Sequence, residues 1–416
     1  MKLHRQHIPN NRRAISLQWI MGCFFVLFCT IPWVNFGLNG LDSQPWPLLF
    51  GLLFLLFLNH KINSRKYLFF LAWLVAFGIL IGMFLIQSSF DFLFFRALGN
   101  YFGFLIIFSS FMFYMDRYGF PEKILFTMNI VWLVGAGLEL IFPGILISIV
   151  NERTNPGRGV TSLAPEPTFF AVYLFFNSWM LLIGTDYRPN FKTKVLLLLN
   201  VAAIFGVSMS SMGVLFLFFA GLVSVSYYFL RFRIKRSTLI KMTAFVMLGF
   251  PTLGFFVSFL EGSGIRLIEL VNRLIVSNPL DLFFMDASMN SRLSNVVFSI
   301  HGFFYNFGLP GGFYSFGEVS NQLSGFYRDY FWYGIGGNKI MSWVGSFLFE
   351  LGFFGLLFLI VLVAKIYDNT RRRWHEIVLL FILLLSAIPL AFPLIPMLMA
   401  TLVVTKKSSQ QGPLRG

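Results

Sequence analysis

The chain has 416 residues, of which 57% are hydrophobic and 12% are charged, and 56 of them are phenylalanine. Soluble proteins carry roughly 25% charged residues, so this composition excludes a soluble globular protein and predicts a chain that crosses a membrane repeatedly. The formal net charge of +15 is compatible with nucleic-acid binding, but its distribution along the chain indicates membrane topology and no nucleic-acid partner.

Apolar runs of about 18 residues or more predict an all-α, polytopic membrane protein with about twelve membrane-spanning helices. The expected spans lie near residues 16–36, 46–58, 67–86, 93–115, 124–147, 167–184, 194–209, 212–230, 240–260 and 342–364. A last apolar block, residues 376–404, has three prolines near its middle. Because proline interrupts a helix, we expect two short spans with a break at AIPLAFPLIP. One long kinked helix is the alternative.

Lysine and arginine in the short connections predict the orientation of these spans. All but eight of the 32 basic residues lie at the two termini or in alternate loops, so both termini are expected on the cytoplasmic side. The eight others fall at or near the outer face: Arg96, Arg153, Arg158, Arg266, Arg273, Arg292, Arg328 and Lys339.

Two outer segments divide the chain into five parts. We expect an N-terminal bundle of five spans at 1–147, a first outer loop at 148–166, spans six to nine at 167–260, a long helical outer loop at 261–341 between spans nine and ten, and the last spans with a basic cytoplasmic tail at 342–416. Within the long loop, the sequence GIRLIELVNRLIV predicts an amphipathic helix that lies in the membrane interface or packs under the rest of the loop.

Positive charge at an outer membrane surface suits a bound anion, and a lipid-linked pyrophosphate is the strongest candidate in a bacterial membrane. The planar guanidinium of arginine matches phosphate oxygens in a bidentate way. The alternative is that these arginines pair with nearby acidic residues or with lipid headgroups. The neighbouring sequence favours anion binding most for Arg158 and Arg292.

Three segments carry a resemblance to a known family. The sequence RGVTSLAPEPTFFA, from Arg158, resembles the arginine and Glu-Pro-Ser pattern of polysaccharide polymerases of the Wzy type. The sequence SRLSNVVFSIHGFFYNFGLPGGFYSFG, from Ser291, is similar to that family's second outer-loop motif, in which an arginine leads into a hydrophobic helix and a Pro-Gly-rich turn. The sequence NKIMSWVGSFLFELGFFG, from Asn338, resembles the family's entry into the next span.

The resemblance implies a GT-C-like glycosyltransferase of the bacterial inner membrane, with its active site in the periplasm. Such an enzyme builds O-antigen or a similar surface polysaccharide in lipopolysaccharide biosynthesis. It transfers the growing glycan, with inversion, from undecaprenyl pyrophosphate to the non-reducing end of a new undecaprenyl-pyrophosphate-linked repeat unit. Both lipid-linked oligosaccharides, membrane lipid, a flippase and a chain-length regulator protein are the partners it implies.

In this interpretation Arg158 and Arg292 form a clamp on the departing pyrophosphate, and Arg153 and Arg328 are further contacts to the same anion. Glu166 is the candidate base, or the group that orients the acceptor hydroxyl. It precedes a proline that favours the first turn of a helix, where the helix dipole favours an ionised carboxylate. The alternatives for Glu166 are a plain capping carboxylate and an ion-pair partner for Arg158.

The second motif adds a histidine and two polar residues. His301 is the only histidine expected on the outer side, but in a continuous helix it lies opposite Arg292 at roughly 100° per residue. His301 can join a catalytic site with Arg292 only if the helix ends before His301. Asn295 and Ser299 share the face of Arg292 and are candidate substrate-binding residues.

The turn that follows contains Gly311 and Gly312, whose backbone N–H groups are candidates to bind phosphate or sugar; a simple turn is the alternative. No Asp-x-Asp occurs on the outer side and no His/Cys cluster occurs anywhere, which predicts a transfer without metal or cofactor. Three charges near or within the expected spans, Arg96, Glu139 and Glu350, should face protein or water, with Arg96 within reach of the site.

Two other functions remain open. A related O-antigen ligase would hand the glycan to lipid A core or protein, but ligases carry a His-Asn pair where this chain has Gly337 and Asn338. A non-enzymatic flippase or transporter of lipid-linked sugar predicts broken helices and charges within the spans. The concentration of charge in the outer segments argues against transport, whereas the break at AIPLAFPLIP favours it.

Overall fold

A computed structural model describes residues 17–35, 43–57, 65–85, 92–150, 159–231, 287–370, 374–385 and 388–404. Over these ranges the chain is helical with no strand, as expected from the sequence. The expected span at 240–260, the expected amphipathic helix at 264–276, and the side chains of Arg153 and Arg158 lie outside the described residues.

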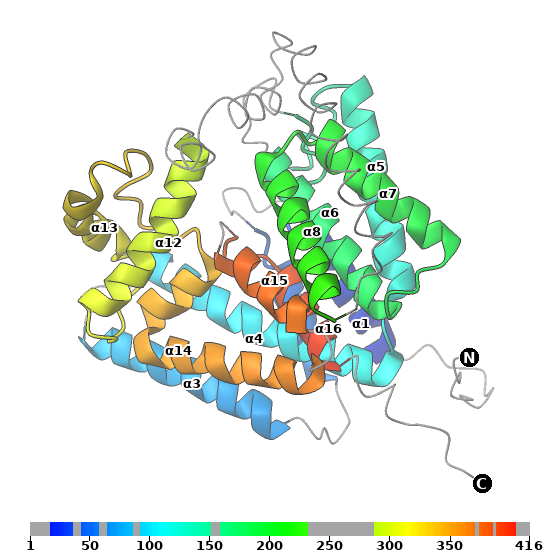
Figure 1. The fold of residues 1–416 in the computed structure, drawn as a ribbon. Coiled ribbons are helices and arrows are strands. Elements are labelled where there is room, and N and C mark those ends of the chain that lie inside the picture. The colour runs from blue at the N-terminus through cyan, green and yellow to red at the C-terminus, as the bar shows by residue number, and fades with distance from the viewer. Residues whose placement is uncertain are drawn as a thin grey trace.

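The described elements are α1 (Leu17–Thr30), α2 (Trp46–Leu56), α3 (Arg65–Leu85), α4 (Phe92–Tyr118), α5 (Glu122–Ile141), α6 (Pro167–Gly184), α7 (Phe191–Gly206), α8 (Ser211–Arg231), α12 (Ala287–Tyr305), α13 (Phe316–Ser324), the 3-10 helix η1 (Gly325–Tyr327), α14 (Trp343–Thr370), α15 (Trp374–Leu385) and α16 (Leu394–Val404). Figure 1 shows their arrangement, with α12 and α13 at one side of the bundle.

Six described helices, α3, α4, α5, α6, α8 and α14, are long and apolar enough to cross a membrane. The helices α1, α2, α15 and α16 are apolar but shorter. The structure thus has the character of a membrane-embedded protein, and the total of about twelve spans and the GT-C-like arrangement stay predictions.

The C-terminal apolar block forms two helices, as predicted, and not one long kinked helix. α15 ends at Leu385, residues 388–393 are not helical, and α16 begins at Leu394. Proline removes a backbone donor and cannot continue a helix, which explains the break at Pro389 and Pro393. Pro396 falls in the first turn of α16, where a missing N–H costs little.

The centre of the bundle is built around α16, in which every residue from Leu394 to Val403 is buried. α16 packs against α4, α6 and α14 (Figure 1). Aromatic rings fill much of the remaining space: Trp132 stacks on Tyr173 with ring centroids 4.1 Å apart. Since lipid tails are as apolar as the helices themselves, such close packing is a main source of helix association in a membrane.

The helices α12, α13 and η1 have a small core of their own, which includes Phe298, Phe316 and Phe331. This unit rests on α14 at a break in that helix. Gly352 has a positive φ of 58° and lies against the turn at Gly308, whose carbonyl oxygen accepts the N–H of Phe353 at 2.7 Å. A side chain at Gly352 would collide with the backbone of that turn, so glycine is required there.

Candidate functional site

A cavity of about 580 Å³ lies where several helices begin. The first turns of α2, α6 and α16 line it, together with α4 from Phe92 to Ile107, Ser346 and Glu350 of α14, and the break before α16. The N-terminus of a helix carries a positive partial charge from its unpaired N–H groups. Helix N-termini from distant parts of the chain therefore converge on one space, an arrangement that favours an anion.

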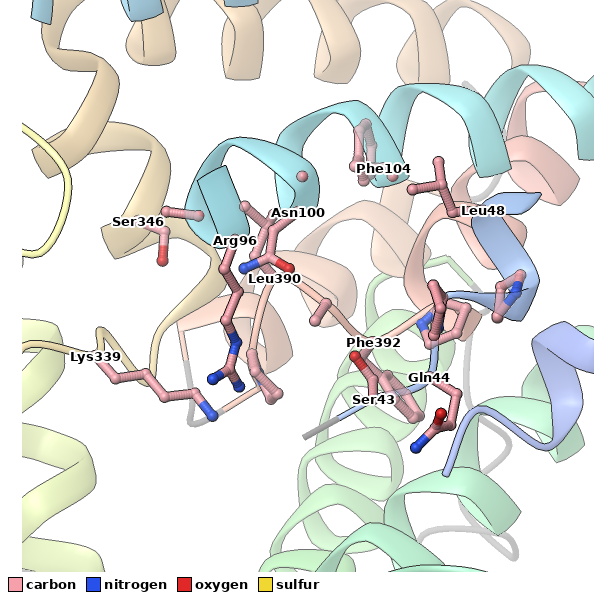
Figure 2. A pocket seen from close by; sticks show the side chains of 18 of the residues that line it. Ser43, Gln44, Leu48, Arg96, Asn100, Phe104, Lys339, Ser346, Leu390 and Phe392 are labelled. Atoms are coloured by element: carbon pink, nitrogen blue, oxygen red, sulfur yellow. The ribbon is translucent and has the colours of Figure 1, made fainter. Parts of the chain in front are cut away.

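Two cationic side chains add full charges to this cavity. Arg96 comes from the second turn of α4, and Lys339 comes from the segment just before α14. Figure 2 shows the guanidinium group of Arg96 and the ammonium group of Lys339 turned toward the same part of the cavity. The amides of Gln44 and Asn100 line it as well, so hydrogen-bond donors surround the space from several directions.

The cavity is spacious because α4 presents small residues to it. Gly99 and Gly103, one turn apart, both line the space, and a Cβ added at either would meet no atom within 4 Å. Gly103 is buried and nevertheless borders open volume. The rest of the wall is largely apolar, with Leu390 and Phe392 from the break before α16. The space therefore suits an amphiphile with a charged head group.

Glu166 lines the cavity from the start of α6. It occupies the N-cap position with extended backbone, and Pro167 begins the helix as predicted. Its carbonyl oxygen accepts the N–H of Phe169 at 3.0 Å, but its carboxylate makes no capping hydrogen bond. A capping hydrogen bond, one of the alternatives for Glu166, is therefore absent from the structure, while its roles as base, as orienting group or as partner of Arg158 stay predictions.

The loop that leads into Glu166 is held at two places in its first half. Gly159 has φ +103°, and a Cβ there would lie 2.3 Å from the carbonyl oxygen of Ser208, between α7 and α8. Farther along, the carboxylate of Glu139 in α5 accepts the backbone N–H groups of Thr161 and Ser162. These contacts explain why the loop arrives at the cavity with Glu166 in a defined place.

A second carboxylate, that of Glu350, lines the cavity from the third turn of α14. The hydroxyl oxygen of Tyr101 in α4 lies 2.5 Å from one oxygen of this carboxylate and 3.0 Å from the carbonyl oxygen of Ser346. Tyr101 is buried and links α4 to α14 at this point. The cavity thus brings together two cations and two carboxylates.

The predicted residues of α12 lie elsewhere. Arg292 is half-buried on α12 and is not among the residues that line the cavity. The amide of Asn295 donates to the carbonyl oxygen of Ser291 and accepts the N–H of Met341, while the hydroxyl of Ser299 donates to a carbonyl oxygen within α12. Neither lines the cavity, and their substrate-binding roles stay predictions.

His301 fails the condition that would bring it beside Arg292. α12 continues to Tyr305, so the two side chains lie on opposite faces of one helix. The Nδ1 atom of His301 lies 3.0 Å from the hydroxyl oxygen of Tyr327, and its ring also contacts Phe326. The histidine therefore belongs to the contact between α12 and η1 and is not among the residues that line the cavity.

In the glycine-rich segment, the N–H of Gly311 is already used within the protein, and the proposed role of Gly312 stays a prediction. The N–H of Gly311 donates to the carbonyl oxygen of Phe349 at 2.7 Å, and Gly312 has φ +84°. The hydroxyl of Ser315 donates to the carbonyl oxygens of both glycines. Arg328 is exposed directly after η1 and does not line the cavity.

Sequence reasoning singled out Arg96 and Glu350 as charges in apolar helices, and both line the cavity. The sequence placed Lys339 at the outer face but gave it no role, and it gave Gln44 and Asn100 none. Polar residues within a span were the available signal for Asn100. In the part of the chain that the structure describes, no group of three or more His, Cys, Asp or Glu side chains is arranged to hold a metal.

Comparisons with known proteins identify no family for this chain. No protein-family model matches it, and searches of curated proteins and of solved structures find no match.

Proposed function

We propose that this chain polymerises lipid-linked oligosaccharide repeat units at the periplasmic face of the inner membrane, building O-antigen or a similar surface polysaccharide. The observation that carries the proposal is the cavity shared by Arg96, Lys339 and Glu166. Such a substrate has an anionic diphosphate, an apolar chain and polar sugars. In the cavity, the cationic groups match the diphosphate, the apolar walls match the lipid chain, and the carboxylates match the sugar hydroxyl groups.

The cations have a clear chemical task in this reaction. When the bond between the anomeric carbon and the diphosphate oxygen breaks, negative charge grows on the departing diphosphate. Arg96 and Lys339, together with the helix N-termini around them, stabilise that charge more strongly in the transition state than in the bound substrate. The clamp of Arg158 and Arg292, with Arg153 and Arg328, stays a prediction from the sequence motifs.

Glu166 has a task on the acceptor side. Its carboxylate, at the start of α6, is free of a capping role and lines the cavity next to the loop that begins at Gly159. A carboxylate accepts hydrogen bonds from sugar hydroxyl groups. In the proposal Glu166 holds the incoming sugar so that the acceptor oxygen approaches the anomeric carbon.

A second candidate function is transport of a lipid-linked sugar. One observation favours it: the non-helical segment between α15 and α16 lines the cavity. Transporters often bind their substrate at discontinuous helices near the middle of the membrane. A transporter needs no group that activates the acceptor, so the two candidates differ in what happens to the glycan.

The surface glycan of cells that lack this protein, separated on a gel, distinguishes the candidates. Loss of a polymerase leaves one repeat unit attached to its final acceptor. Loss of a ligase leaves none attached, while polymer accumulates on the carrier lipid. Loss of a transporter leaves single lipid-linked units on the cytoplasmic face. A single attached unit is the result expected from the proposal, and either of the other two patterns overturns it.

The cavity is then tested by complementation. Losing a hydrogen bond to a charged group costs about 1.5–3 kcal/mol, so Arg96→Ala and Lys339→Ala should each slow polymerisation by about 10- to 100-fold. Arg188→Ala is the matched control, because Arg188 is exposed, lies outside the cavity lining and has no proposed role in substrate binding. A normal ladder from both cavity variants, at normal protein levels, would remove the cavity from the proposal.

A further inference from the structure

We infer that Glu350 is the general base of the transfer, with Tyr101 as the residue that positions it. This inference rests on the proposed function and adds to it a catalytic residue. The carboxylate of Glu350 lines the cavity from a helix that is long and apolar enough to cross a membrane. A charge in such a position is costly unless it faces protein or water, which makes it a functional candidate by default.

Only one of the two carboxylate oxygens of Glu350 makes a hydrogen bond within the described residues. Tyr101 is its only hydrogen-bond partner among the described residues, and that hydroxyl contacts one carboxylate oxygen at 2.5 Å. The tyrosine is itself fully enclosed by the packing of α4 on α14, so the carboxylate is held in one orientation. The second oxygen remains available to a hydroxyl group in the cavity.

A purely structural link between α4 and α14 does not require an acid. Tyr101 already lies 3.0 Å from the carbonyl oxygen of Ser346, so its hydroxyl has an acceptor on α14 without Glu350. An apolar side chain at position 350 would avoid the cost of placing a carboxylate in a membrane helix. The acid therefore needs an explanation beyond packing, and a cavity ligand supplies one.

The two carboxylates of the cavity are placed for different tasks. Glu166 precedes the first residue of α6, beside the loop. Glu350 is the eighth residue of α14, about 10 Å along the helix from its start at 1.5 Å per residue. In this inference Glu166 orients the acceptor sugar, and Glu350 accepts the proton of its reacting hydroxyl group.

The step is balanced without a further reactant. The oxygen of the acceptor hydroxyl forms a bond to the anomeric carbon of the donor glycan. The bond from that carbon to the diphosphate oxygen breaks, and its electron pair leaves with undecaprenyl pyrophosphate. The hydroxyl proton moves to the oxygen of Glu350 that Tyr101 does not contact, and it is released to water when the product leaves.

The test uses full-length protein in lipid vesicles with the lipid-linked repeat unit that accumulates in cells lacking this protein. Positioned general bases contribute about 10²- to 10⁴-fold to rate, so Glu350→Gln should lower kcat by that factor. Binding of the lipid-linked unit and the thermal unfolding temperature should stay near those of the wild type. Glu166→Gln should instead raise KM, and Tyr101→Phe should lower kcat by less than Glu350→Gln.

Chemical rescue separates a base from a structural residue. Glu350→Ala leaves room for a small carboxylate, and added formate should restore part of its rate, while formate should leave Glu166→Gln unchanged. A rate for Glu350→Gln within about threefold of the wild-type rate overturns the inference. It is also overturned if Glu350→Gln loses binding and rate together and formate fails to rescue Glu350→Ala. If wild-type vesicles form no polymer at all, the proposed function itself has failed.

Discussion

The carboxylate of Glu139, near the end of α5, accepts the backbone N–H of Ser162 at 2.6 Å. The same carboxylate accepts the hydroxyl of Thr161 at 2.9 Å and its N–H at 3.4 Å. The hydroxyl of Ser162 in turn donates to the carbonyl oxygen of Trp132 in α5. An acidic residue in an apolar helix thus has a structural task, because it secures the loop that ends at the cavity.

Glu139→Gln should destabilise this loop. An amide has one acceptor oxygen, so its NH₂ group would face an N–H or hydroxyl donor that has lost its partner. Leaving a buried donor unsatisfied costs about 1–3 kcal/mol, which should appear as a lower unfolding temperature of the purified protein. Glu318→Gln, exposed on α13, is the control and should leave that temperature unchanged. Equal unfolding temperatures for both variants would contradict the structural task of Glu139.

Gly159→Ala should be more damaging than an ordinary glycine substitution. The alanine would need a positive φ, and its Cβ would lie 2.3 Å from the carbonyl oxygen of Ser208. We expect the loop to leave its place and polymerisation to be lost. Gly137→Ala in α5 is the control, since a Cβ there meets no atom within 4 Å. The measurement is the glycan ladder at matched protein levels; a normal ladder from Gly159→Ala would show that the contact with Ser208 is dispensable.

Gly103→Leu should block the cavity without unfolding the protein. A side chain at this position extends into open volume that the proposal assigns to substrate. Gly221→Leu is a matched control, because Gly221 is also a helical glycine with no atom within 4 Å of an added Cβ, but it lies outside the cavity lining. The expected result is a lost ladder for the first variant and a normal ladder for the second, with similar unfolding temperatures. Two normal ladders would exclude this cavity as the site.

Asn290→Ala should loosen the unit formed by α12, α13 and η1. The buried amide of Asn290 donates to the carbonyl oxygen of Tyr330 at 2.8 Å and accepts the N–H groups of Trp332 and Tyr333 at 3.0 and 3.1 Å. These hydrogen bonds are part-buried, and each one lost costs about 0.5–1.5 kcal/mol. Limited proteolysis should therefore cut the segment around residues 330–333 faster in this variant than in Gln322→Ala, an exposed control on α13. Similar cleavage rates would argue against the role of Asn290.

Arg292 and Arg96 allow two versions of the diphosphate site to be compared directly. The motif resemblance assigns the anion to Arg292, whereas the cavity assigns it to Arg96. If the diphosphate lies in the cavity, Arg96→Ala should slow polymerisation by about 10- to 100-fold and Arg292→Ala by much less. Lys substitutions that keep the charge should recover part of any loss. If Arg292→Ala instead slows polymerisation more than Arg96→Ala does, the diphosphate site lies at α12.

Several features of the fold were predictable because their causes are local. A proline lacks its backbone donor wherever the rest of the chain lies, so Pro167 marks the start of α6 and AIPLAFPLIP separates α15 from α16. Charges in apolar helices were also expected to face protein or water. Glu139 and Glu350 do so, the first against a loop and the second at the cavity.

The contacts of each helix face were not predictable in the same way. Helical spacing correctly places Asn295 and Ser299 on one face of α12, but it does not say what that face meets. In the fold, Asn295 bonds to the backbone before α14, and Ser299 packs against Gly345, where a Cβ would lie 2.2 Å from its hydroxyl oxygen. Spacing likewise put His301 opposite Arg292, and only the length of α12 showed that the helix does not end before it.

The sequence by itself determined that this is an all-helical protein of membrane character, because hydropathy and proline act on each segment separately. Only the tertiary structure decided which polar groups share one cavity. Gln44, Arg96, Glu166, Lys339 and Glu350 come from distant points of the chain and line the same cavity. Their meeting depends on how bulky and small side chains of separate helices fit together, and no local pattern contains that information.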